Sequence, residues 1–160
     1  MAFTTCTNLN DERRRRRSKD PLVAMRFQLM QVMDDFKLKA CVLASDEGLL
    51  LVSPESVAVE DAELLAAMGT LPRNEEGMII NDELVASFLD QLSGSITLDE
   101  QEKTAPSKSV YTQEFWAWDQ PWVMVAVGHL SRAQELSLMR AIMGIRRIAR
   151  QSEPVEKVSA

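Results

Sequence analysis

Residues 40–53 read ACVLASDEGLLLVS, which is two short apolar runs separated by Asp46, Glu47 and Gly48. Apolar runs of this length, joined by acidic residues and a glycine, are typical of two antiparallel strands connected by a tight turn. Glycine supplies the positive φ that such a turn needs, and Pro54 ends the second run because proline cannot donate to a strand ladder. The stretch therefore predicts a β-hairpin.

A helix is predicted on each side of this hairpin. Before it, Asp20 is a candidate cap, Pro21 suits the first helical position, and apolar residues recur at helical spacing over 20–38. After it, acidic residues open a helix over 60–71, where they complement the helix dipole, and Pro72 ends it. Alanines make this second helix slim, so either another helix can approach it closely or it packs tightly onto its own sheet.

The rest of the chain continues the alternation of helices and strands. Asn81 caps a short helix that ends at Gly94, residues 95–98 are a candidate strand, and 99–108 have the composition of an exposed polar loop. Strands are predicted at 110–118 and 122–127, and a final helix at 131–150. Hairpins dominate this order, which predicts an α+β fold with a mostly antiparallel sheet flanked by helices.

Charge divides the 160 residues into an arm, one domain and a tail. The net charge is −6, yet the first 19 residues hold six basic and two acidic residues. We expect 1–19 to be a disordered arm, 20–150 to be one domain, and 151–160 to be a flexible tail. The basic residues of the arm include an unbroken run: Arg13, Arg14, Arg15, Arg16 and Arg17.

Composition leaves little material for catalysis. The chain has two cysteines and one histidine, His129, and it lacks the phosphate-binding glycine motifs and the HExxH and CxxC patterns. We therefore expect a protein that is not an enzyme and has no cofactor or metal. No apolar run is long enough to span a membrane, and the N-terminus has no signal-peptide pattern, which indicates the cytoplasm.

Two groups of residues are candidates for binding another protein. The slim helix offers Leu64, Ala66, Ala67 and Met68 as a dimer or partner interface. Three indoles bracket one turn and cannot all be buried there cheaply, so they are possible partner anchors: Trp116, Trp118 and Trp122.

The hairpin and slim helix together resemble the roadblock / dynein-light-chain family. The resembling stretches are FKLKACVLASDEGLLLVS (36–53) and VEDAELLAAMGTL (59–71), and most of the match rests on Asp46, Gly48, Glu63, Ala66 and Ala67. The resemblance implies a five-stranded antiparallel sheet between helices, in the roadblock/longin-like order α-β-β-α-β-β-β-α. It also implies homodimers or heterodimers built by the slim helix and an edge strand. Such a dimer would serve as a platform for small Ras-like GTPases or for signalling and motor complexes. Bacterial members include GTPase-activating partners without a catalytic residue of their own.

The sequence departs from the family pattern at Pro72 and the loop 72–80, at residues 81–108, which have the appearance of an insertion, and at the arginine arm. Three other functions stay open. They are an acidic chaperone of the type III secretion kind that binds an effector segment, a ligand-sensing domain of the GAF or PAS type, and nucleic-acid binding by Arg13–Arg17 alone.

Overall fold

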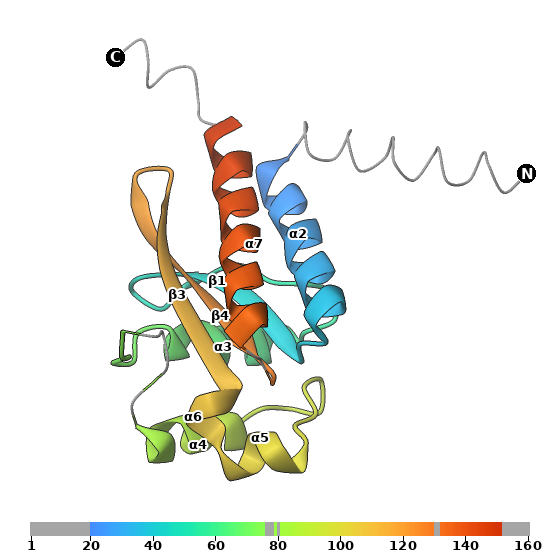
Figure 1. Cartoon of the computed structure of the whole chain (residues 1–160), viewed down its shortest axis with the longest axis vertical. Coiled ribbons are helices and arrows are strands. Elements are labelled where there is room, and N and C mark those ends of the chain that lie inside the picture. Colours follow the sequence, from blue (N-terminus) through green and yellow to red (C-terminus); the bar gives the residue numbers. More distant parts are fainter. Residues whose placement is uncertain (1–19, 76–78, 80, 130–131, 152–160) are drawn as a thin grey trace, which may run out of the picture.

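The predicted hairpin forms in the computed structural model, which describes residues 20–75, 79, 81–129 and 132–151 (Figure 1). It joins β1 (Ala40–Ser45) to β2 (Leu50–Val52). Gly48 has a φ of +89°, and a Cβ atom at this position would lie 2.8 Å from Cγ2 of Thr70. The turn therefore needs glycine both for its backbone conformation and for its close contact with a later part of the chain.

Outside residues 95–108, the other elements follow in the predicted order. Asp20 and Asn81 act as the predicted caps, accepting hydrogen bonds from the backbone N–H groups of Leu22 (3.0 Å) and Leu84 (3.1 Å). The remaining elements are α2 (Pro21–Phe36), α3 (Val59–Met68), α4 (Asp82–Asp90), α5 (Glu100–Thr104), α6 (Pro106–Ser109), β3 (Val110–Ala117), β4 (Gln120–Val127) and α7 (Arg132–Gln151).

The described strands form one antiparallel sheet in the order β2-β1-β4-β3. The predicted α+β class with an antiparallel sheet is confirmed at this level. Strand β4 lies between β1 and β3, and its residues from Trp122 to Val127 are all buried. This explains its apolar character on both faces, since both faces of a central strand are covered by helices.

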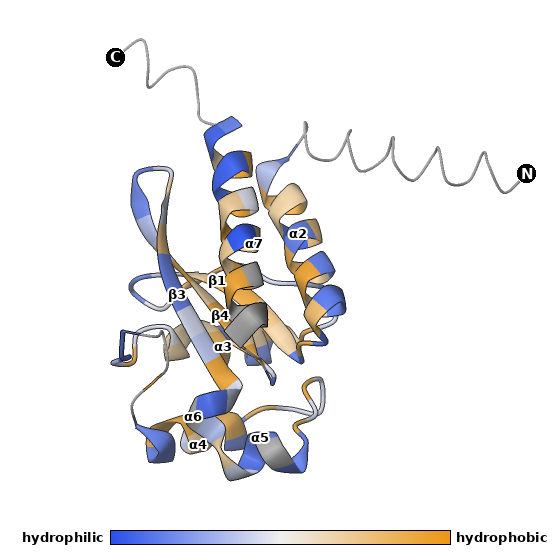
Figure 2. Cartoon of the chain, in the orientation of Figure 1, coloured by the Kyte–Doolittle hydropathy of each residue, from blue (hydrophilic) through white to orange (hydrophobic). Residues whose placement is uncertain are grey.

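Helices cover the two faces of the sheet with two separate cores. Helices α2 and α7 lie side by side over one face, while α3 and α4 contribute to the core on the opposite face (Figure 1). Figure 2 shows hydrophilic residues at the C-terminal end of α7. Major members of the first core are Met25, Leu29, Leu43, Phe115, Trp122, Met124, Leu138 and Ile142; those of the second are Val42, Leu65, Met68, Ile79, Val85, Val123 and Val125.

Two expectations for residues 95–108 are wrong. Residues 95–98 form no strand, because the Ser95 hydroxyl bonds Asp61 of α3 and Ile96 is buried in the second core. The segment predicted as an exposed loop instead contains α5 and α6. The backbone N–H of Asp99 donates to Glu102 (3.1 Å) and that of Glu102 donates to Asp99 (2.9 Å), which is the reciprocal pattern that starts a helix.

The described sheet thus has four strands where the family resemblance implies five. The arm expected at 1–19, including Arg13–Arg17, lies outside the described residues. So does the tail expected at 151–160, apart from Gln151, which is the last residue of α7.

Candidate protein-interaction surface

The slim helix α3 uses much of its small surface within its own chain. Ala66 and Met68 are fully buried, Met68 in the core that α3 shares with the sheet and α4, while Leu64 and Ala67 are half-buried. Alanines therefore bring α3 close to the strands beneath it, because a methyl side chain adds little thickness. Leu64 and Ala67 are the two members of the predicted interface set that a partner can reach in a single chain.

The three tryptophans lie in three different environments. Trp122 is buried, Trp118 is half-buried against it with ring centroids 5.4 Å apart in an edge-to-face arrangement, and Trp116 is 59% exposed. Edge-to-face packing stabilises aromatic pairs beyond the area that they bury. The structure therefore brings Trp118 and Trp122 together at the end of the sheet and leaves Trp116 open to solvent.

The turn between β3 and β4 is a tight two-residue connection with an unusual residue in it. Trp118 and Asp119 have φ values of +50° and +57°, the conformation in which glycine and asparagine are the common residues. A bulky residue in this region costs about 1–2 kcal/mol. The indole Nε1 of Trp118 donates a 2.8 Å hydrogen bond to the carbonyl oxygen of Ala149, so a contact with α7 offsets this strain.

Strand β3 is an outer edge of the sheet, and its hydrogen-bonding pattern follows from one contact. The N–H of Gly128 donates to the carbonyl oxygen of Ser109 at 2.8 Å, in line with the unbroken register between β3 and β4. In an antiparallel pair, hydrogen-bonded residues alternate with residues whose backbone groups face away from the partner. The odd-numbered residues of β3 therefore bond to β4, and Glu114 and Trp116 direct their N–H and C=O groups to the outer edge.

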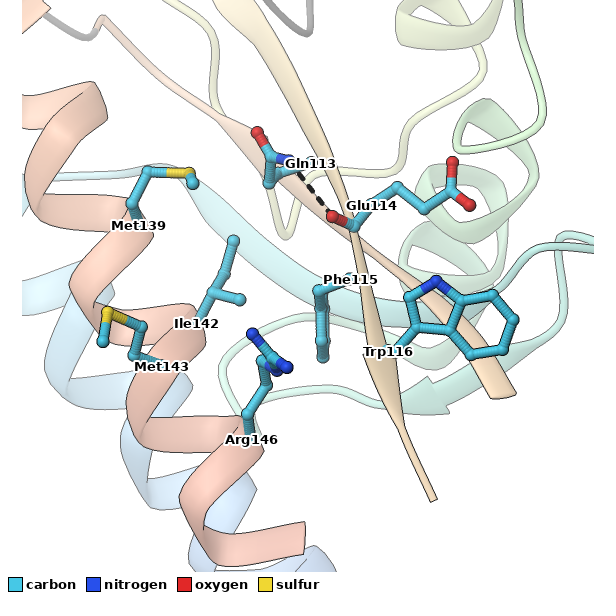
Figure 3. A pocket seen from close by; sticks show the side chains of 8 residues that line it. All are labelled: Gln113, Glu114, Phe115, Trp116, Met139, Ile142, Met143 and Arg146. Atoms are coloured by element: carbon cyan, nitrogen blue, oxygen red, sulfur yellow. Dashed lines mark hydrogen bonds between the residues drawn. The ribbon is translucent and has the colours of Figure 1, made fainter. Parts of the chain in front are cut away.

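A groove of about 290 Å³ lies between this edge and helix α7 (Figure 3). Phe115 and Ile142, both nearly buried, belong to the lining, together with Met139, Met143 and Arg146 of α7. Figure 3 shows Arg146 reaching from α7 toward Phe115, while Trp116 lies on the far side of β3. The groove is open to solvent and lies next to the outward backbone groups of β3.

An apolar stripe on α7 continues this groove. Leu136, Met139 and Met143 are spaced at i, i+3 and i+7, and they are 67%, 41% and 60% exposed. Residues with this spacing lie on one face of a helix. A soluble chain rarely exposes a contiguous row of large apolar side chains without a binding role. We treat the β3 edge, the groove and this stripe together as the β3–α7 surface.

The charge on this surface is opposite to that of the whole chain. Arg146 lines the groove and Arg150 lines a neighbouring hollow, and residues 136–151 contain no acidic residue, whereas the chain has a net charge of −6. Among the ion pairs formed within the described residues, none includes Arg146; Glu114 of β3 instead pairs with Arg73 at 3.0 Å. The surface therefore offers arginine side chains beside apolar ones.

Two carboxylates among the described residues are buried, and both lie away from the β3–α7 surface, where they interact with other side chains of the fold. Burial raises the pKa of Asp61, but hydrogen bonds from Ser93 and Ser95 outweigh it, and the pKa is lower than usual. Burial raises the pKa of Glu102, which lies 4.0 Å from the Lys39 Nζ atom. Neither carboxylate lines the β3–α7 surface.

Other reactive groups offer no catalytic arrangement in the described part of the chain. Burial raises the pKa of the Cys41 thiol to about 12, so this thiol is a small core residue and a poor nucleophile. His129 is exposed just after β4. Within the described residues, no three His, Cys, Asp or Glu side chains are grouped so that they can hold a metal ion.

Sequence reasoning missed the role of α7 in this surface. Its pattern predicts an inward face at Leu138, Ile142, Ile145 and Ala149, all of which are buried. A signal was nevertheless present, since apolar residues at Leu136, Met139 and Met143 widen the stripe beyond what one buried face of a helix requires.

No family model matches the chain, and neither a curated protein nor a solved structure matches it. In the part of the chain that the structure describes, none of the helices has the length and apolar character needed to cross a membrane.

Proposed function

We propose that the chain is a cytoplasmic, non-enzymatic interaction module of the roadblock type. It assembles as a homodimer, or as a heterodimer with a related subunit, and it binds or regulates a small Ras-like GTPase or a signalling or motor complex. The observation that carries the proposal is the β3–α7 surface, where an open strand edge lies beside exposed apolar side chains.

An open edge of this kind favours a binding role over a purely structural one. Proteins usually protect an edge strand by making it short or by placing charges, prolines or bulges on it. Strand β3 is in unbroken register with β4. Its first three residues are buried, whereas its second half carries the exposed Glu114 and Trp116 with the groove of α7 beside them. A protein partner that covers this edge would satisfy its backbone groups and bury the apolar stripe.

The opposite edge of the sheet supports the dimer part of the proposal. Strand β2 ends the sheet there, in contact with α3, and Leu49 and Leu51 are 63% and 37% exposed. Leu64 and Ala67 of α3 are half-buried. We assign the dimer contact to α3 and β2, which leaves the β3–α7 surface for a different partner. The described residues form four strands. The fifth strand that the roadblock family implies is therefore part of this proposal.

The proposal has a competing reading in the type III secretion-like chaperone, an acidic dimer that binds an extended effector segment. The groove beside β3 is the one feature that favours the chaperone, because an extended segment can add to an open strand edge. The two functions differ in the protein that is bound, which is a secreted effector for a chaperone and a GTPase or a related subunit for a roadblock-type module.

Affinity capture of the full chain, beside a matched copy that lacks residues 1–19, tests this proposal. We expect a small Ras-like GTPase or a related subunit in both samples, because the contacts are assigned to the folded domain. Stimulated or slowed GTP hydrolysis by the captured GTPase then defines the regulatory role. Capture of a secreted effector favours the chaperone, and capture of nucleic acid by the longer copy alone contradicts the proposal.

A further inference from the structure

The β3 edge has the geometry to accept one more strand. Glu114 and Trp116 direct their backbone N–H and C=O groups outward, while Phe115 between them bonds to Trp122 of β4. An extended segment laid along this edge would continue the antiparallel ladder, with alternate side chains directed toward α7. Those side chains would enter the groove between β3 and α7.

The lining of the groove changes from apolar to basic along its length. Met139 and Met143 lie about 6 Å apart along the helix axis, and Arg146 lies about 4.5 Å beyond Met143. Arg150, which lines a neighbouring hollow at the end of β3, lies about 10.5 Å beyond Met143. Side chains on one face of a strand repeat about every 6.6 Å. An extended segment would therefore place two alternate side chains beside the methionines and the next alternate one between the two arginines.

The charge of the groove selects the side chain that lies beside Arg146. Arg146 has no ion-pair partner among the described residues, and α7 has no acidic residue between 136 and 151. An aspartate or glutamate at this position would form a charge-assisted hydrogen bond with the guanidinium group, and a lysine would be repelled. The groove thus favours an acidic residue next to apolar ones.

The same charges disfavour a second copy of the chain as the symmetric occupant. A two-fold contact through β3 would bring α7 near its own copy, and both helices carry Arg140, Arg146, Arg147 and Arg150. It would also bring Glu114 near Glu114 of the copy in the central register, and like charges placed opposite each other destabilise paired strands. A different polypeptide is therefore the better occupant.

We propose that the β3–α7 surface binds an extended segment of a partner protein in which an acidic residue is followed, at the next two alternate positions, by apolar residues, because a segment antiparallel to β3 runs from Arg146 toward Met139. The segment adds to β3 as a fifth strand, its apolar side chains contact Met139 and Met143, and its carboxylate bonds Arg146. This inference rests on the proposed function, since it names the chemistry of the partner that the module binds.

Fluorescence anisotropy with a labelled peptide of sequence Thr-Glu-Thr-Val-Thr-Leu-Thr tests the proposal on the full chain. A matched peptide with lysine in place of glutamate is the control ligand. We expect the glutamate peptide to bind at least about tenfold more tightly, the range expected for one charge-assisted bond. Arg146→Glu should reverse this preference, whereas Arg140→Glu, which alters an exposed arginine outside the groove, should leave it unchanged.

Hydrogen exchange tests the strand addition separately. We expect the glutamate peptide to slow exchange of the Glu114 and Trp116 amides, because these point to the new strand. Equal binding of the two peptides, no binding, or unchanged exchange at β3 would overturn the inference, as would self-association through β3. If only this inference fails, the chain still dimerises and still captures a GTPase. If the proposed function fails, neither the dimer nor the captured GTPase is found.

Discussion

The indole Nε1 of Trp118 donates a 2.8 Å hydrogen bond to the carbonyl oxygen of Ala149. Ala149 lies near the C-terminal end of α7, where carbonyl groups commonly accept hydrogen bonds from side chains. Trp118 is also the first of the two positive-φ residues in the turn between β3 and β4. One side chain therefore satisfies a helix end and holds the hairpin against α7, at the basic end of the groove.

Removing this bond should weaken the fold measurably. We expect Trp118→Phe to lower the free energy of unfolding by about 1 kcal/mol, because it keeps an aromatic ring but removes the donor. The matched control is Trp116→Phe, whose 59% exposed side chain should change stability by less than about 0.5 kcal/mol. Urea unfolding followed by circular dichroism measures both variants, and equal losses would show that the bond contributes nothing.

The hairpin turn should reject any side chain at Gly48. We expect Gly48→Ala to cost about 2 kcal/mol, from a φ of +89° and a Cβ atom 2.8 Å from Cγ2 of Thr70. Adding Thr70→Ser should recover part of the loss, since it removes that methyl group but not the backbone strain. At Gly94 an added Cβ would meet nothing within 4 Å, so Gly94→Ala should be neutral or slightly stabilising. Thermal unfolding of the four chains checks this order.

Asp61 should make the fold sensitive to acid. Burial raises its pKa, but hydrogen bonds from Ser93 and Ser95 lower the pKa by more than burial raises it, so that it lies below its usual value. Its stabilisation is complete above the unfolded pKa of about 3.9 and is lost as the pH falls through the lowered folded pKa. Asp61→Asn should cost about 2 kcal/mol at neutral pH and flatten the loss of stability below about pH 4.

The exposed Glu63 on the same helix is the control for Asp61. Glu63→Gln should leave both the neutral stability and its decline in acid close to those of the parent chain. Unfolding in urea at a series of pH values gives both quantities. An acid decline of the same steepness in Asp61→Asn and in the parent would contradict the assigned role of this carboxylate.

The Cys41 thiol should resist alkylation in the folded chain. Its pKa of about 12 leaves almost no thiolate at pH 8, and the side chain is fully buried in the first core. In a Cys6→Ser background, we expect iodoacetamide to label Cys41 only as fast as the protein unfolds. The same chain in concentrated urea should react at the rate of an ordinary thiol, and comparable rates in the two conditions would be inconsistent with this burial.

Local signals in the sequence were sufficient for the hairpin, the caps and the class of fold. Asp20 and Asn81 cap helices as predicted, Gly48 has the positive φ that the turn requires, and the doubly apolar stretch at 122–127 is the covered strand β4. Each of these features is decided by neighbours in the chain or by a simple apolar period. The sequence order then suffices to predict an antiparallel sheet with helices on its faces.

Long-range contacts explain what the sequence pattern missed. Residues 95–98 have a strand-like composition, but the Ser95 hydroxyl bonds Asp61, 34 positions away, and this holds the segment against α3 instead. The composition around Glu102 is that of a polar loop, whereas its reciprocal hydrogen bonds with Asp99 and its burial place it in a helix. The β3–α7 surface could not be predicted because it depends on how β3 pairs with β4, which decides that the backbone groups of Glu114 and Trp116 face outward. No local sequence pattern contains this information.

The mass of the assembly in solution tests the central claim most directly, since the account describes a dimeric interaction module. Sedimentation equilibrium at tens of micromolar should give about twice the chain mass of 18.0 kDa, or the mass of a complex with a related subunit when both are present. Leu64→Glu with Ala67→Glu should return the mass to 18.0 kDa with the fold intact, because both side chains are half-buried and lie on the assigned contact. A single-chain mass for the parent with or without the related subunit, or a dimer that both glutamates leave unchanged, would contradict the account.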